Sequence, residues 1–184
     1  MTNYERALSN LDKFLIKNSI EYAIIGGIAV IIYGFQRTTK DIDATILCQL
    51  EDLDKIHAIV EKKFKPAFKG TLEYFQRNFI LPVDEPETNL RIDLAAGLTE
   101  FDRNVISRSK RKCFGEVEVS VCSLEDLIIY KMFAGRYIDL GDVELLLEKH
   151  KNSVDKKYLL ETAEKFKELE REDIIKNLNK LFNQ

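Results

Sequence analysis

The sequence predicts an α/β fold (α+β in its element order) in which a mixed β-sheet is flanked by helices and followed by a C-terminal helical bundle. Apolar or alternating segments of strand length recur up to Cys122, and segments with apolar residues at helical spacing separate them. After Cys122 only helical spacing remains. We therefore expect a core over residues 1–122 and a helical region over residues 123–184 that packs on this core.

The expected elements follow from local patterns. Alternation of apolar and polar residues indicates strands, apolar residues at helical spacing indicate helices, and clusters of proline and acidic residues indicate loops. In chain order we expect helix 3–17, strand 22–25, helix 28–33, strand 41–46, helix 50–64, a strand with loops over 64–81, loop 82–89, strand 90–95, strand 116–122, a helix from Ser123 to Gly135-Arg136, helix 143–147, and two further helices after Asp155.

Composition excludes several classes of protein. The chain has 184 residues, of which 45% are apolar and 32% charged, as in ordinary globular proteins. It contains no apolar run long enough for a membrane span, so we expect no membrane partner. The N-terminus lacks the features of a signal peptide, and the three cysteines lack the spacing of a zinc site. Together these features predict a cytoplasmic location.

The net charge of −3 gives the chain as a whole no basic footprint for nucleic acid. One segment, Arg103 to Lys112, is locally basic. It could hold the phosphates of RNA or of a triphosphate, or it could be a solvated turn ahead of a hairpin. The sequence leaves both interpretations open.

A glycine pair, Gly26-Gly27, directly follows the apolar segment Tyr22 to Ile25. The short apolar segment Ile28 to Tyr33 comes next, so the pair is expected at a strand-to-helix turn. Glycine at such a turn allows positive φ and lets a ligand approach without meeting a Cβ. Backbone N–H groups there favour a phosphate. A plain tight turn would explain an isolated glycine pair equally well.

Two carboxylates, Asp41 and Asp43, stand on either side of Ile42. Because alternate residues of a strand point to the same side, both carboxylates should lie on one face, with Thr45 after them. Neighbouring carboxylates repel unless a cation or a proton lies between them, and oxygen ligands of this kind suit Mg²⁺. On its own, the pair would equally fit a solvated strand.

A third carboxylate, Asp93, lies in the alternating segment Leu90 to Leu94. If this strand neighbours the first, Asp93 joins Asp41 and Asp43. Three carboxylates on adjacent strands can hold two divalent ions about 3.5–4 Å apart, as in-line phosphoryl transfer requires.

Gly26-Gly27, followed by Asp41-Ile42-Asp43 and later by Asp93, resembles the signature of the polymerase-β-like nucleotidyltransferase superfamily. The form Arg-x-Thr-x-Asp-Ile-Asp, from Arg37, resembles minimal prokaryotic nucleotidyltransferases of the abortive-infection toxin (AbiEii-like) group. So does Lys-x-x-Ala-Gly-Arg-x-x-Asp-x-x-Asp-Val, from Lys131 to Val143. One departure is that many members have Gly-Ser where this chain has Gly-Gly-Ile.

The resemblance implies an enzyme that moves NMP from an NTP to a hydroxyl acceptor and releases pyrophosphate. Asp41, Asp43 and Asp93 would be catalytic and would hold two Mg²⁺ ions, with Mn²⁺ as a substitute. Lys131 would be catalytic by facing the nucleotide phosphates, although a surface lysine is the plain interpretation. The residues expected to contact the nucleotide are Gly26, Gly27, Arg37, Thr39 and Asp139; Asp139 would equally serve as a helix N-cap.

RNA, for example a tRNA end, is the acceptor that the toxin-like group implies, and a cognate antitoxin or toxin partner protein is a further implication. Three alternatives stay open. The acceptor could be an antibiotic hydroxyl, it could be a protein that receives AMP, or the chain could be a binding module that keeps only the fold. The presence of all three carboxylates argues against the last.

Overall fold

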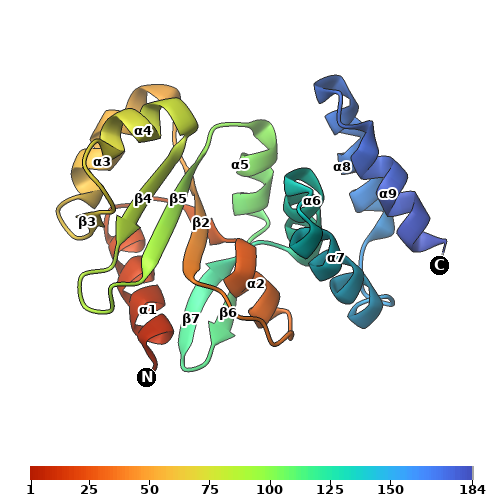
Figure 1. Cartoon of the computed structure of the whole chain (residues 1–184), viewed down its shortest axis with the longest axis horizontal. Helices are drawn as coiled ribbons and strands as arrows, with labels where there is room; N and C mark the ends of the chain where they lie inside the picture. The colour runs from red at the N-terminus through yellow and green to blue at the C-terminus, as the bar shows by residue number, and fades with distance from the viewer. Residues whose placement is uncertain (184) are drawn as a thin grey trace. The chain divides into compact units, whose positions relative to one another are not determined.

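The computed structural model describes residues 1–183, which form two compact units, Met1–Cys122 and a second unit that begins at Ser123. The first unit contains a seven-stranded sheet in the order β3-β4-β5-β2-β1-β7-β6 (Figure 1). Its strands are β1 (Tyr22–Ile24), β2 (Asp41–Leu47), β3 (Lys65–Pro66), β4 (Ile80–Asp84), β5 (Arg91–Gly97), β6 (Lys110–Phe114) and β7 (Val117–Val121). Its helices are α1 (Asn3–Lys17), α2 (Gly26–Ile32), η1 (Leu50–Asp52), α3 (Leu53–Val60), α4 (Thr71–Asn78) and α5 (Glu100–Ser107).

The sheet is mixed, as the sequence predicts. Strand β2 pairs in parallel with β5 and antiparallel with β1, and β1 pairs in parallel with β7. Figure 1 shows α1 behind the sheet and α2 in front of it. The core of the unit lies on the faces where strand residues such as Ile42, Ala44 and Ile92 are fully buried. The α/β fold class is confirmed.

Helix α1 illustrates how the local sequence sets an element. Thr2 and Glu5 form a reciprocal capping box at its start. Leu8, Leu11 and Leu15 are fully buried on its sheet-facing side. These three positions follow the spacing of one helical face, so the predicted amphipathic helix is confirmed.

The prediction of a strand with loops over residues 64–81 is wrong in its centre, where α4 lies. This helix begins after Gly70, at a φ of +90°, and ends at Phe79, at a φ of +59°. Its aromatic residues suggested a strand, but only Phe75 is fully buried, while Tyr74 is exposed on the helix surface. One buried aromatic per turn suits a short surface helix.

The predicted loop over residues 82–89 is also shorter than expected, because Pro82 lies inside β4. The carbonyl of Pro82 accepts a hydrogen bond from Ala67, next to the short strand β3. The nitrogen of Pro82 therefore faces the same side, away from β5, and its missing N–H removes no bond from the β4–β5 ladder.

The predicted turn over the basic segment Arg103 to Lys112 is shorter than expected, because only Arg108 and Ser109 lie between regular elements. The first part of the segment belongs to α5 and its last part to the edge strand β6. The guanidinium of Arg111 forms an ion pair with Asp12, and the hydroxyl of Tyr22 also bonds Asp12. Arg111 thus joins α1 to the sheet edge, which gives this basic residue a structural role.

The second unit is entirely helical over its described residues. It consists of α6 (Leu124–Ala134), α7 (Tyr137–Lys149), α8 (Lys156–Lys165), η2 (Phe166–Leu169) and α9 (Glu172–Phe182). The hydroxyl of Ser123 caps α6, and Gly135 ends it at a φ of +64°. Helix α7 begins at Tyr137 instead of Val143, so Asp139 lies within its first turn and is not its N-cap. None of the helices in residues 1–183 combines the length and apolar character of a bilayer span.

Cysteine accessibility tests the fold directly. Cys48 and Cys122 are buried and Cys113 is exposed, and burial raises the pKa of the Cys48 thiol to about 11. We expect one thiol per chain to react rapidly with a maleimide in the folded protein, and all three in denaturant. Cys113→Ser should abolish the rapid phase. A rapid phase that persists in this variant would contradict the burial of the other two.

Candidate active site: a three-carboxylate cluster

The pairing of β2 with β5 brings three carboxylates together. The two strands are parallel. Asp43 lies directly beside Asp93, and Asp41 lies beside Arg91 two residue pairs earlier. One carboxylate oxygen from each of Asp41, Asp43 and Asp93 lies within 4.8 Å of the others. The predicted adjacency of the two strands is confirmed; the role of the cluster as a ligand set stays a prediction.

The electrostatics of Asp93 fit a bound cation. Its Oδ1 atom is buried and has no hydrogen-bond partner. Burial raises the pKa of Asp93, the charges of Asp41 and Asp84 add to this effect, and Arg91 opposes it. A divalent cation would supply the buried oxygen with a partner and would reduce the repulsion between the neighbouring carboxylates. The carboxylate donor set is the one that Mg²⁺ and Mn²⁺ prefer.

The glycine pair lies against the carboxylate strand. Gly26 has a φ of +63°, and a Cβ built on it would be 2.0 Å from Oδ2 of Asp43. A Cβ on Gly27 would be 2.6 Å from Oγ1 of Thr39. The backbone N–H of Ile25 donates to the carbonyl of Asp43 at 3.0 Å. The glycines therefore allow the start of α2 to approach the cluster, and their contact with phosphates stays a prediction.

Thr39 positions Asp41. Its hydroxyl lies 3.0 Å from Oδ1 of Asp41 and donates to this carboxylate. The carbonyl of Thr39 accepts a hydrogen bond from the Tyr4 hydroxyl of α1 at 2.7 Å. These two hydrogen bonds hold Thr39 beside the cluster. Its contact with the nucleotide stays a prediction. Arg37 lies on the same segment between α2 and β2 and is half-exposed, and its predicted role also stays a prediction.

Sequence reasoning missed Tyr4 and the ion pair between Asp84 and Arg91, whose Oδ1 and Nε atoms are 2.8 Å apart. Arg91 pairs with Asp41 in the strand register, so this ion pair borders the cluster. The Tyr4 contact joins segments that are far apart in the sequence, so no spacing identifies it. The ion pair was missed because Asp84, which lies in β4, was predicted to be in a loop.

Lys131 lies in the second unit among charged neighbours. Its Nζ atom is 3.0 Å from Oδ1 of Asp139 and 2.6 Å from Oδ2 of Asp142, and the side chain is only 4% exposed. The alternative of a surface lysine is therefore wrong. Burial would raise the pKa of Asp139, but hydrogen bonds from Arg136 and Lys131 outweigh it and hold this pKa below its ordinary value. Asp142 belongs to the Lys131–Val143 motif, but no role was predicted for it, although its spacing from Asp139 on one helical face was a usable signal.

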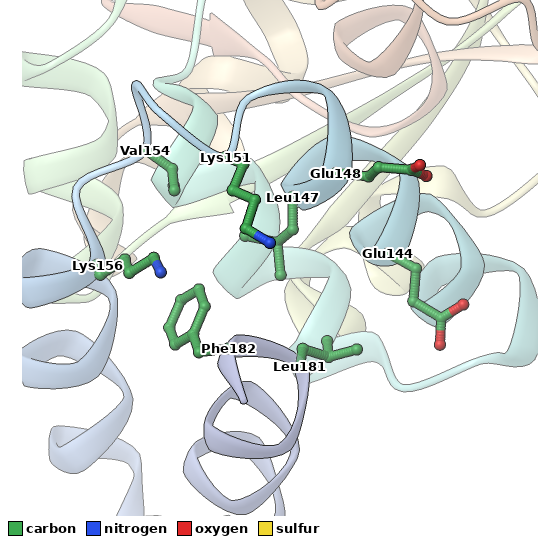
Figure 2. A pocket seen from close by; sticks show the side chains of 8 residues that line it. All are labelled: Glu144, Leu147, Glu148, Lys151, Val154, Lys156, Leu181 and Phe182. Atoms are coloured by element: carbon green, nitrogen blue, oxygen red, sulfur yellow. The ribbon is translucent and has the colours of Figure 1, made fainter. Parts of the chain in front are cut away.

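A separate pocket of about 350 Å³ in the second unit shares no residue with either cluster. Figure 2 shows its lining of acidic, basic and apolar side chains: Glu144, Leu147, Glu148, Lys151, Val154, Lys156, Leu181 and Phe182. The Lys156 ammonium lies 5.0 Å from the centre of the Phe182 ring. Its two glutamates and two lysines balance in charge, so the pocket favours neither anions nor cations.

A mixed sheet with three carboxylates on parallel neighbours and a glycine turn against them defines the nucleotidyltransferase class. The chain belongs to the family described as "Nucleotidyl transferase of unknown function" (DUF2204), whose model matches residues 4–180. The resemblance to nucleotidyltransferases and the enzyme class are thereby confirmed, while the toxin subgroup stays a prediction. No curated protein matches the sequence.

Solved structures with this fold include the antibiotic-resistance factor ANT(2'')-Ia, with a TM-score of 0.56 at 12% identity over 79% of this chain and 83% of that one. An antigenic nucleotidyltransferase-like protein from Paracoccidioides brasiliensis has a TM-score of 0.55 at 16% identity over 96% and 92% of the chains. The lincosamide adenylyltransferase LnuA has a TM-score of 0.50 at 14% identity over 77% and 95%. At these identities the likeness shows the fold alone.

Gly26→Ala tests the contact between α2 and the cluster. Gly70→Ala is its matched control, since Gly70 also has positive φ but its Cβ would meet only Oε2 of Glu73, at 3.5 Å. Backbone strain should destabilise both variants by about 1–2 kcal/mol. Gly26→Ala should be destabilised further because it displaces Asp43, and it should also abolish nucleotidyl transfer. Equal unfolding free energies and full activity would show that the close approach is unimportant.

Lys131→Met tests the buried ion cluster of the second unit. Removal of the lysine leaves Asp139 and Asp142 without its charge, so the free energy of unfolding should fall by about 3–5 kcal/mol. Lys131→Met/Asp139→Asn/Asp142→Asn should recover most of this stability, as chemical denaturation would measure. If the triple variant folds and retains full transfer activity, the predicted catalytic role of Lys131 is wrong.

Proposed function

We propose that the protein is a metal-dependent nucleotidyltransferase that moves NMP from an NTP to a hydroxyl acceptor and releases pyrophosphate. The observation that carries this proposal is the convergence of Asp41, Asp43 and Asp93 within 4.8 Å. The orphaned Asp93 oxygen and the glycine turn against Asp43 support it.

In this proposal Asp41, Asp43 and Asp93 would hold the divalent ions. The bound ions, Mg²⁺ or Mn²⁺, would supply electrostatic stabilisation of the charge on the transferring phosphoryl group. Thr39 keeps the carboxylate of Asp41 in place through its hydrogen bond. Asp93 helps to take the proton from the acceptor hydroxyl. Gly26 and Gly27, which bring backbone close to Asp43 and Thr39, would offer N–H groups to the NTP phosphates. Arg37 would add a positive charge to the same phosphates.

RNA, for example a tRNA end, is the acceptor we propose, with a toxin-like role and a cognate partner protein. This choice rests on the resemblance of the Arg37–Asp43 and Lys131–Val143 segments to the abortive-infection group. A cytoplasmic setting belongs to the same proposal.

An antibiotic hydroxyl is the second candidate acceptor. It is favoured by the shared fold with ANT(2'')-Ia, solved with adenylyl-2''-tobramycin (TM-score 0.54), and with lincomycin-bound LnuA. The fold alone does not choose between acceptors, because one fold hosts many substrates.

Transfer is tested with each labelled NTP, Mg²⁺ and total RNA, and in parallel with tobramycin and lincomycin. We expect label in RNA with the wild-type protein and none with Asp41→Asn/Asp43→Asn. Asp52→Asn/Asp54→Asn, which removes two carboxylates of the same unit outside the cluster, should retain transfer. Label in an antibiotic or in protein would replace RNA as the acceptor, and no label in any of them would contradict the proposal.

Metal binding has its own readout. Mg²⁺ should raise the melting temperature of the wild-type protein, since a ligand at 100 times its Kd stabilises by about 2.7 kcal/mol. Asp93→Asn should remove this effect. Without metal, Asp93→Asn should be no less stable than the wild type, because it removes a carboxylate that burial and like charges disfavour. Equal Mg²⁺ stabilisation of both proteins would contradict a metal site at the cluster.

A further inference from the structure

A groove of about 460 Å³ lies between α1 and the end of α3 in the first unit. Its lining consists of four lysines, two asparagines and two apolar residues: Asn10, Lys13, Phe14, Lys17, Asn18, Ile59, Lys62 and Lys63. No carboxylate lines it, although the whole chain has 31 acidic and only 28 basic residues. The groove therefore concentrates positive charge on a protein whose net charge is negative.

The positive charges of the groove are uncompensated. All four lysines are exposed, and none of them forms an ion pair with another residue of the described chain. Arg111 of the basic segment differs, because Asp12 neutralises it. The pocket in Figure 2 differs too, because its lining contains two glutamates as well as two lysines. Among these three sites, only the groove has an excess of positive charge that would attract an anion.

The shape of the groove is set by packing beneath the lysines. The rings of Phe14 and Phe64 meet edge to face, with their centroids 5.1 Å apart, and hold α1 against the end of α3. Lys13 and Lys17 are one helical turn apart on the α1 side, and Lys62 and Lys63 lie on the α3 side. Cations on both sides of an open groove suit a linear polyanion that lies between them.

We propose that this groove binds the phosphate backbone of an RNA acceptor. The inference rests on the proposed function for the identity of its ligand. A cationic antibiotic would be repelled by four lysines, whereas repeated phosphates match them. Helix α1 lies behind the sheet, and α2, whose Gly26 contacts Asp43, lies in front (Figure 1). An RNA chain that binds both the groove and the carboxylate cluster must therefore reach from one face of the sheet to the other.

The test measures binding of a fluorescent single-stranded RNA by anisotropy as a function of salt, in the Asp41→Asn/Asp43→Asn background so that no transfer occurs. Lys13→Gln/Lys17→Gln and Lys62→Gln/Lys63→Gln each remove one side of the groove. Lys55→Gln/Lys69→Gln is the matched control, since both lysines are exposed in the same unit but do not line the groove. Each phosphate that a variant no longer neutralises should reduce the salt slope by about 0.7.

We expect each groove pair to lower the slope by about 1.4 and to weaken binding, and the control pair to leave both unchanged. Equal slopes for groove and control pairs would overturn the inference. The inference would also be overturned if the groove variants bound RNA as before but no longer bound phosphatidylserine vesicles. That result would indicate that the groove binds a membrane surface instead. Because binding needs no chemistry, failed transfer with intact groove binding would reject the proposed activity and keep the groove as an RNA site.

Discussion

The parallel pairing of β2 with β5 is the constraint on which the site depends. It places three negative side chains within 4.8 Å of one another, an arrangement that electrostatics alone opposes. The opposite faces of the same strands bury Ile42, Ala44, Ile92 and Leu94 completely. A slip of one residue would expose these apolar side chains and turn the carboxylates inward. Burial of the apolar face thus holds the charged face in register.

The glycine pair has a packing role that the sequence alone could not separate from a ligand-binding role. At Gly26 the positive φ and the contact with Asp43 both exclude a side chain. The turn brings the start of α2 against the carboxylate strand whether or not a phosphate is bound. The packing role and the ligand-binding role therefore impose the same requirement, which is a residue without a Cβ next to the carboxylate cluster.

The sequence predicted what depends on local periodicity and missed what depends on tertiary contacts. Alternation around Asp43 and Asp93 identified both strands and the face of each carboxylate, because burial of one strand face leaves a period of two. Helix α4 was missed since its aromatic residues favour strands in isolation. The start of α7 was misplaced, so the partners of Lys131 were hidden. The bond from Tyr4 to Thr39 joins α1 to a distant segment, and no spacing encodes it.

Charge balance separates the two clusters that the motifs pointed to. In the second unit the buried Lys131 pairs with Asp139 and Asp142, and the exposed Arg136 also pairs with Asp139, so two cations meet two anions. A cluster of this kind satisfies itself, and breaking it is costly. In the first unit three carboxylates converge, and a buried oxygen of Asp93 has no hydrogen-bond partner. A cluster with excess negative charge that is partly desolvated gains the most from a bound cation. The cluster of the first unit is therefore the better candidate for the site of chemistry. The cluster of the second unit is the better candidate for a structural role within its own helices.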